Sequence, residues 1–199
     1  MSQSAQPRTV QSADHGSFNI RGYILLAILL AAGFILNMFV GKAIGALTGN
    51  MIQPEFIISA FCLTILVIRP GILEALVIGL ISAAVIQLTT SSPFIDFAAE
   101  GVAAMLMAAM VLGARGKVSA PFAGISTFVT TAVSGIIFMA IKMVLLGAEA
   151  VMPLLTGMLP VVLLTAVFNG VLVAALYLPI KGALGSVDFG GKDNSSRYE

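Results

Sequence analysis

The sequence has few of the side chains from which most catalytic and metal sites are built. Its 199 residues include one cysteine (Cys62), one histidine (His15) and no tryptophan. A single cysteine excludes an intrachain disulfide and a thiolate metal cluster. His15 lies in a polar N-terminal stretch, and no GxxxxGK phosphate-binding loop occurs in the chain. We therefore expect no enzyme activity, no metal site and no cofactor.

Charge is also scarce. Asp, Glu, Lys and Arg together make up 10% of the residues, against about 25% in soluble domains. Hydrophobic residues make up 59%, and the mean hydropathy is +1.06. The ten basic residues are spread along the chain and the net charge is +1, so nucleic-acid binding is not expected. This composition predicts an integral membrane protein embedded in the lipid bilayer.

Apolar runs divide the chain into six segments separated by polar turns such as Arg69-Pro70-Gly71. A helical bilayer crossing takes about 20 residues, and the runs lack the alternation of barrel strands. The first run is longer than the apolar core of a signal peptide, which has about 7 to 15 residues. The expected helices cover residues 23–40, 56–68, 72–88, 97–113, 121–146 and 152–180.

The fold prediction is an all-α integral membrane protein with six transmembrane helices in residues 23–180. Residues 1–22 and 181–199 are polar, and we expect them to form a cytoplasmic N-terminal extension and a cytoplasmic C-terminal tail. Residues 41–54 contain several glycines and polar side chains. We expect this stretch to be a loop that folds over the outer face.

The basic residues predict the orientation. If both termini are cytoplasmic, Lys42 is the one basic residue in an outside loop, and Lys142 lies within a helix. Lys and Arg concentrate in the cytoplasmic segments of membrane proteins, so we expect an N-in, C-in, multi-pass protein in the plasma membrane of a prokaryote. The inside basic residues are then Arg8, Arg21, Arg69, Arg115, Lys117, Lys181, Lys192 and Arg197.

Two ionisable residues fall inside the expected helices. Glu100 lies near the start of the fourth helix, and Lys142 lies near the outer end of the fifth. A charge at the bilayer centre costs about 2.5 to 3.5 kcal/mol, so such residues usually face a cavity or a partner. Glu100 also suits a helix N-terminus, and Lys142 is long enough to extend to the membrane interface. As a pair, they match the ammonium and the carboxylate of an amino acid.

Uncharged polar and aromatic residues extend this candidate site. Asn37, Gln87 and Asn169 occur inside apolar runs, where their amides need a ligand or a neighbouring helix as a partner. Phenylalanines near the outer end are candidates for stacking on a planar ligand. The candidate substrate-binding residues are Asn50, Gln53, Gln87, Thr89, Thr90, Glu100, Phe138, Lys142 and Asn169, with Phe94 and Phe97 as further aromatic candidates.

Six short motifs follow one another through the apolar region. They are Gln53-Pro54-Glu55-Phe56, Leu76-Val77-Ile78-Gly79, Leu88-Thr89-Thr90-Ser91-Ser92-Pro93, Val133-Ser134-Gly135-Ile136-Ile137-Phe138, Ala166-Val167-Phe168-Asn169 and Tyr177-Leu178-Pro179-Ile180. In order and spacing, residues 23–180 resemble the substrate-binding (S) component of energy-coupling factor (ECF) transporters, and most of all its tryptophan-type branch. The chain departs from that pattern at Gln53, where the family often has a basic residue. It also departs after Pro93, where Phe94-Ile95-Asp96 replaces a glycine pair and further polar residues.

The resemblance implies a function in nutrient uptake. It implies a pocket on the outer side, closed by the loop after the first helix, that captures tryptophan or a related aromatic compound. It implies as partners a membrane coupling subunit and two cytoplasmic ATPase subunits. Ala27 and Ala31 would form the face that meets the coupling subunit, because small residues let helices approach closely.

Three other functions are compatible with the residues. One is an S component for a vitamin or another cofactor precursor. Another is a structural or assembly subunit of a membrane complex, in which the polar residues serve helix packing alone. The third is a stand-alone transporter or channel, although ionisable residues would then be expected along a whole pore, and here they gather near one end.

Overall fold

The computed structural model describes residues 20–90, 92–115 and 117–184, and all the regular structure in these ranges is helical. This confirms the all-α prediction. The extension and the tail predicted at 1–22 and 181–199 lie largely outside the described residues. The elements are α1 (Ile20–Leu36), the π-helical turn η1 (Asn37–Gly41), α2 (Lys42–Leu47), α3 (Phe56–Ile68), α4 (Ile72–Ile86), α5 (Ile95–Gly113), α6 (Ala120–Leu146), the short 3-10 helix η2 (Ala148–Ala150) and α7 (Val151–Leu184).

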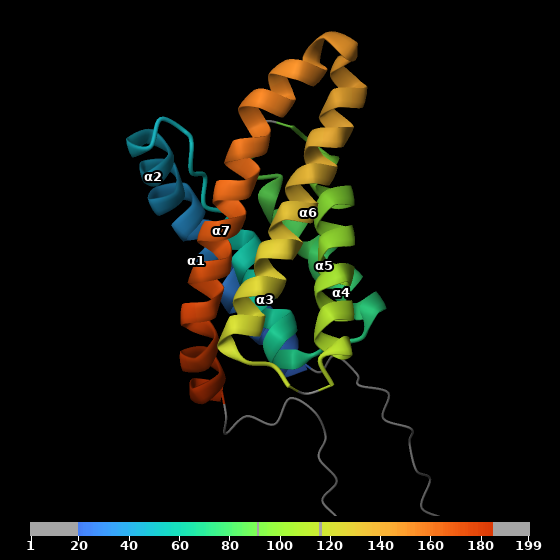
Figure 1. The fold of residues 1–199 in the computed structure, drawn as a ribbon. Coiled ribbons are helices and arrows are strands. Elements are labelled where there is room, and N and C mark those ends of the chain that lie inside the picture. The colour runs from blue at the N-terminus through green and yellow to red at the C-terminus, as the bar shows by residue number, and fades with distance from the viewer. Residues whose placement is uncertain (1–19, 91, 116, 185–199) are drawn as a thin grey trace, which may run out of the picture.

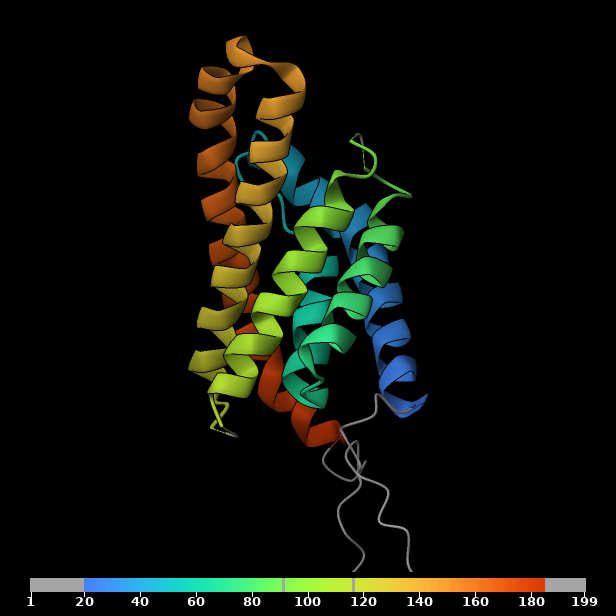
Figure 2. The same ribbon diagram turned by 90° about the vertical axis from the view of Figure 1, so that its right-hand side faces the viewer.

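The helices form an elongated bundle in which successive long helices run in opposite directions (Figure 1). α3 lies at the centre, and its residues from Phe56 to Leu66 are all buried. α6 and α7 form a hairpin that extends beyond the other helices at one end (Figure 2). The described chain begins and ends at the opposite end of the bundle, which we call the closed end (Figures 1 and 2).

Four helical stretches are long and apolar enough to cross a membrane. α3 and α4 are also apolar, but they have 13 and 15 residues. These helices support a multi-pass membrane protein, whereas the number of six crossings and the orientation stay predictions. The four long stretches are Gly22–Leu47, Ile95–Gly113, Ala120–Leu146 and Ala148–Leu184.

The predicted loop at residues 41–54 is wrong over its first half, because the helix continues through η1 and α2 to Leu47. Gly41 and Gly45 are both buried, one turn apart. A Cβ atom on Gly41 would lie 3.3 Å from the Pro54 carbonyl oxygen, and one on Gly45 would lie 3.3 Å from Asn50 Oδ1. These glycines therefore allow the following residues to fold back against the helix, and they do not end it. The connection itself is residues 48–55, which we call the 48–55 segment.

The apolar core lies toward the closed end. Phe61, Ile65, Met107, Val173 and Tyr177 come from α3, α5 and α7, and each is less than 2% exposed. In a membrane, close packing of such side chains holds helices together, since lipid tails are as apolar as the helices.

Candidate functional site

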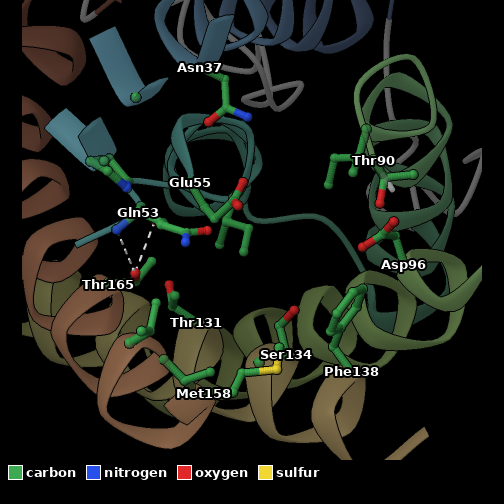
Figure 3. Close-up of a pocket in the computed structure, with 18 of the residues that line it drawn as sticks. Asn37, Gln53, Glu55, Thr90, Asp96, Thr131, Ser134, Phe138, Met158 and Thr165 are labelled. Carbon is green, nitrogen blue, oxygen red and sulfur yellow. Dashed lines mark hydrogen bonds between the residues drawn. The ribbon is translucent and has the colours of Figure 1, made fainter. Parts of the chain in front are cut away.

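A cavity of about 720 Å³ lies between the helices at the end opposite the closed end, which we call the cavity end (Figure 3). The η1–α2 region, the N-termini of α3 and α5 and facing halves of α6 and α7 contribute to its wall. Small-molecule sites commonly have volumes of about 300 to 1,000 Å³. The polar and charged side chains of the wall are Asn37, Lys42, Asn50, Gln53, Glu55, Thr89, Thr90, Asp96, Glu100, Thr131, Ser134, Lys142 and Thr165.

The π-helical turn η1 begins at Asn37, which lines the cavity. Its Oδ1 accepts a hydrogen bond from the Phe56 backbone N–H at 3.3 Å. The first N–H groups of a helix have no partner within the helix, so Asn37 satisfies one of those of α3. π-Helical turns are frequent at functional sites, and this one ties the first helix to the start of the central one.

Two side chains of α7 hold the 48–55 segment by its backbone. Thr165 Oγ1 accepts a hydrogen bond from the Gln53 N–H at 3.3 Å and donates one to the Gln53 carbonyl oxygen at 3.0 Å. Asn169 Oδ1 accepts from the Glu55 N–H at 3.3 Å, and its Nδ2 donates to the Glu55 carbonyl oxygen at 3.2 Å. Residues four apart share one helix face, so Thr165 and Asn169 bond to the backbone of alternate residues of the segment, Gln53 and Glu55. We call this pair the Thr165–Asn169 clamp.

Gln87 fixes the start of α5. Its Oε1 accepts a hydrogen bond from the Phe94 N–H at 2.9 Å, and its Nε2 donates to Asp96 Oδ2 at 3.2 Å. Phe94 has a φ of 70°, a left-handed conformation that is costly for a residue with a Cβ. The Gln87 amide therefore stabilises a strained helix start and at the same time positions the Asp96 carboxylate at the cavity.

Glu100 lies one turn beyond Asp96 on α5 and is 3% exposed. Its Oε1 accepts a hydrogen bond from Ser134 Oγ on α6 at 2.9 Å. Its Oε2 is buried and has no hydrogen-bond partner among the described residues. A buried polar atom without a partner costs free energy, and this one belongs to a residue of the cavity wall.

Two lysines complete the charged wall. Lys142 Nζ lies 5.0 Å from the centre of the Phe138 ring, within the range of a cation–π interaction. Lys42 is exposed on α2. Throughout the part of the chain that the structure describes, neither lysine forms an ion pair with Glu55, Asp96 or Glu100.

Glu55 lies in the connection before α3, outside the helices that could span a membrane. Burial raises the pKa of its carboxyl group to about 7, and the negative charge of Asp96 adds to the shift. A hydrogen bond from Asn37 acts in the opposite direction. The charge of Glu55 therefore changes near neutral pH.

Of the nine predicted substrate-binding residues, all but Gln87 and Asn169 line the cavity. Gln87 and Asn169 lie behind its wall, where they position Asp96 and the 48–55 segment. The further aromatic candidates, Phe94 and Phe97, do not line the cavity, and Phe94 is 76% exposed. The residues that line it as predicted are Asn50, Gln53, Thr89, Thr90, Glu100, Phe138 and Lys142.

Several wall residues were not among the candidates. Sequence reasoning did not single out Glu55, Asp96, Thr131, Ser134 or Thr165 as ligand-binding residues. On α6, however, Thr131, Ser134, Phe138 and Lys142 recur at intervals of three or four residues. This helical spacing places them on one face and is the signal that could have found Thr131 and Ser134.

The predicted coupling residues lie away from the cavity. Ala27 and Ala31 of α1 are both exposed. Because they are four residues apart, they share one face of the helix. This small-residue face is therefore available for contact with another membrane helix.

Comparisons with known proteins give no relative for this chain. No protein-family model matches it, and neither a curated protein nor a solved structure matches it. The features that bear on function are therefore the cavity, the exposed face of α1 and the motifs of the sequence.

Proposed function

We propose that this chain is the substrate-binding component of an ECF-type uptake transporter, and that it captures a small nutrient at the cavity end. Tryptophan or a related aromatic compound is the nutrient that the motif resemblance favours. The cavity of about 720 Å³ carries the proposal, because its volume suits a ligand of that size and its wall combines apolar surface with polar groups.

The unpartnered Glu100 Oε2 argues against a purely structural subunit. Polar residues that serve helix packing alone find their partners on neighbouring helices, as Asn169 of α7 does with Thr131 of α6. Ser59, Thr127 and Tyr177 also bury a hydroxyl group without a partner among the described residues, but of these four residues Glu100 alone lines the cavity. A ligand-binding role accounts for a carboxyl group at this position.

The distribution of polar residues argues for capture rather than for a continuous pore. The described residues toward the closed end form an apolar cluster that includes Phe61, Met107 and Tyr177. A stand-alone transporter or channel would carry ionisable groups along its path through the membrane. In an ECF-type arrangement, the translocation and the ATP hydrolysis belong to the coupling subunit and the two ATPase subunits.

Ala31→Trp tests the proposed coupling role. The bulky ring would prevent close approach at the exposed face of α1, so we expect loss of complex formation with a co-expressed coupling module and loss of nutrient uptake. Ligand binding to the purified variant should match that of the parent protein. Ala109→Trp is the matched control, because Ala109 is an exposed alanine on α5, away from that face.

Co-purification of the chain with the coupling module measures complex formation, and a thermal-shift panel of amino acids and vitamins identifies the ligand. A complex that Ala31→Trp leaves intact would contradict the interface. A panel in which nothing raises the unfolding temperature would contradict the capture of such nutrients.

A further inference from the structure

Three carboxyl groups face two amino groups in the same cavity. Glu55, Asp96 and Glu100 supply the carboxyl groups, and Lys42 and Lys142 supply the amino groups. Asp96 and Glu100 lie one turn apart on α5, so they share a face of that helix. Glu55 reaches the cavity from the start of α3. When all five groups are ionised, the wall carries one negative charge in excess.

The protein compensates these carboxyl groups incompletely. Asp96 accepts hydrogen bonds from the neutral Gln87 amide, the Thr90 hydroxyl and its own backbone N–H, whereas Glu100 accepts one from the neutral Ser134 hydroxyl. Glu100 Oε2 accepts none from the described residues, although the side chain is 3% exposed. The helix dipole of α5 favours acidic groups near its start, but its effect is small beside the cost of burying a carboxylate without a cation.

The two lysines compensate these groups only from a distance. Lys142 Nζ lies over the Phe138 ring and is near enough to Asp96 to attract its carboxylate, and Lys42 is exposed to solvent. Neither makes an ion pair with the three acidic residues in the ranges that the structure covers. Glu100, the most deeply buried of the three, therefore has no cationic side chain in contact with it.

A single metal ion does not fit this arrangement. In the described residues, no group of three or more His, Cys, Asp or Glu side chains is close enough to hold one. Phe138, Met158 and Val162 also line the cavity, and these are poor surroundings for a hydrated ion. An organic molecule with one charged end and an apolar body matches both kinds of wall (Figure 3).

We infer that the cavity selects an organic amine: a ligand whose ammonium group is attracted by the carboxyl groups of Glu55, Asp96 and Glu100 without contacting all three at once, whose apolar body lies against Phe138 and the facing part of α7, and which carries no net negative charge. The inference rests on the proposed function and narrows its substrate class. A zwitterion such as tryptophan brings a carboxylate as well and leaves the excess negative charge of the wall in place. An amine without a carboxylate neutralises it.

Three indole probes that differ in charge test the inference on the purified full-length protein. Tryptamine is a cation, tryptophan is a zwitterion and indole-3-propionate is an anion, while the ring is the same in all three. Calorimetry at pH 8 should show that tryptamine binds at least about tenfold more tightly than tryptophan, the scale of one charge-assisted contact, and that indole-3-propionate does not bind. Agmatine and arginine repeat the comparison without an aromatic ring.

Two substitutions sharpen the result. Glu100→Gln should weaken tryptamine binding by about tenfold or more, whereas Glu149→Gln, at an exposed position in the α6–α7 hairpin, should not change it. Lys142→Met removes a positive charge from the wall, so it should tighten tryptamine binding and weaken tryptophan binding. The affinity of each variant is compared with that of the parent protein. If a variant does not fold, the ranking of the three indole probes on the parent protein still tests the inference.

The inference is overturned if tryptophan or indole-3-propionate binds more tightly than tryptamine, or if neither amine binds. These outcomes differ from failure of the proposed function. Suppose that an anionic or neutral nutrient raises the unfolding temperature and that the chain still assembles with a coupling module through α1. That result would support the uptake function and contradict binding of an amine.

Discussion

The closed end and the cavity end are built from the same helices but differ in what the helices present to one another. α5 presents Ala103, Ala104 and Met107, all 0% exposed, to its neighbours at the closed end. At the cavity end, the same helix presents Asp96 and Glu100. The closed end thus consists mainly of small and apolar side chains in direct contact, with a few buried hydroxyl groups such as that of Tyr177, whereas the cavity end has charged and polar side chains around a space.

This difference indicates which end stabilises the fold and which end is available for function. Side chains in contact on all sides contribute packing energy, and a buried carboxyl oxygen without a partner costs free energy. The two ends should therefore respond in opposite ways to the same kind of substitution.

Glycine-to-alanine substitutions in a close-packed helix interface and in the open cavity wall should give the largest contrast. A Cβ atom at Gly79 would lie 2.5 Å from the Glu100 carbonyl oxygen, whereas one at Gly157, which lines the cavity, meets nothing within 4 Å. We expect Gly79→Ala to lower the free energy of unfolding by about 3 kcal/mol through overpacking between α4 and α5. Gly157→Ala should leave the stability unchanged or raise it by up to about 1 kcal/mol. Denaturant unfolding in detergent measures both, and equal effects would refute the contrast.

Loosening the Thr165–Asn169 clamp should have a smaller effect on stability and a distinct effect on binding. Thr165→Val keeps the shape but removes both hydrogen bonds to Gln53, so we expect a loss of about 1–2 kcal/mol in the free energy of unfolding. Ligand dissociation should become faster, because the 48–55 segment is less firmly held. Thr156→Val is the matched control, since Thr156 is exposed and bonds only to carbonyl groups of its own helix. Stopped-flow binding measures the rates, and equal rates in both variants would exclude a positioning role.

The pH dependence of amine binding should give the smallest effect. The pKa of Glu55 is raised to about 7 by burial and by Asp96, so this carboxyl group gains a proton as the pH falls from 8 to 6. The other charged groups of the cavity wall are Asp96 and Glu100 from α5, Lys142 from α6 and Lys42 from α2.

A protonated Glu55 no longer attracts an ammonium group, so the Kd of tryptamine should rise about tenfold between pH 8 and pH 6. Tryptamine keeps its charge over this range. Calorimetry at several pH values measures the effect, and Glu55→Gln should flatten the profile. A parent profile that is already flat, or that slopes the other way, would show that Glu55 does not bind the amine.

Much of the helical framework follows from the sequence, because long apolar runs and Pro-Gly turns act locally. The helix predicted over residues 56–68 begins and ends at Phe56 and Ile68 in the structure. The prediction of a loop over 41–54 is wrong over its first half, because Gly41 and Gly45 allow close contact with residues that come later in the chain. Spacing along one helix does not reveal such a contact.

The candidate site was predictable to the extent that polarity inside apolar runs marks it. Glu100 and Lys142 were found in this way and line the cavity. Gln87 and Asn169 gave the same signal, yet their amides bond to protein groups behind the wall. Whether a buried amide faces a space or a neighbouring helix depends on tertiary geometry, which composition and periodicity do not contain.

The most direct test of the account is the side of the membrane from which the cavity end is reached. In a Cys62→Ala background, Gln53→Cys places a thiol in the 48–55 segment at the cavity, and Lys117→Cys places one at the turn between α5 and α6. A maleimide that cannot cross membranes should label Gln53→Cys in intact cells, and tryptamine should slow that labelling. Lys117→Cys should react only after the cells are permeabilised. Labelling of Lys117→Cys in intact cells, with Gln53→Cys protected, would contradict capture of a nutrient from outside.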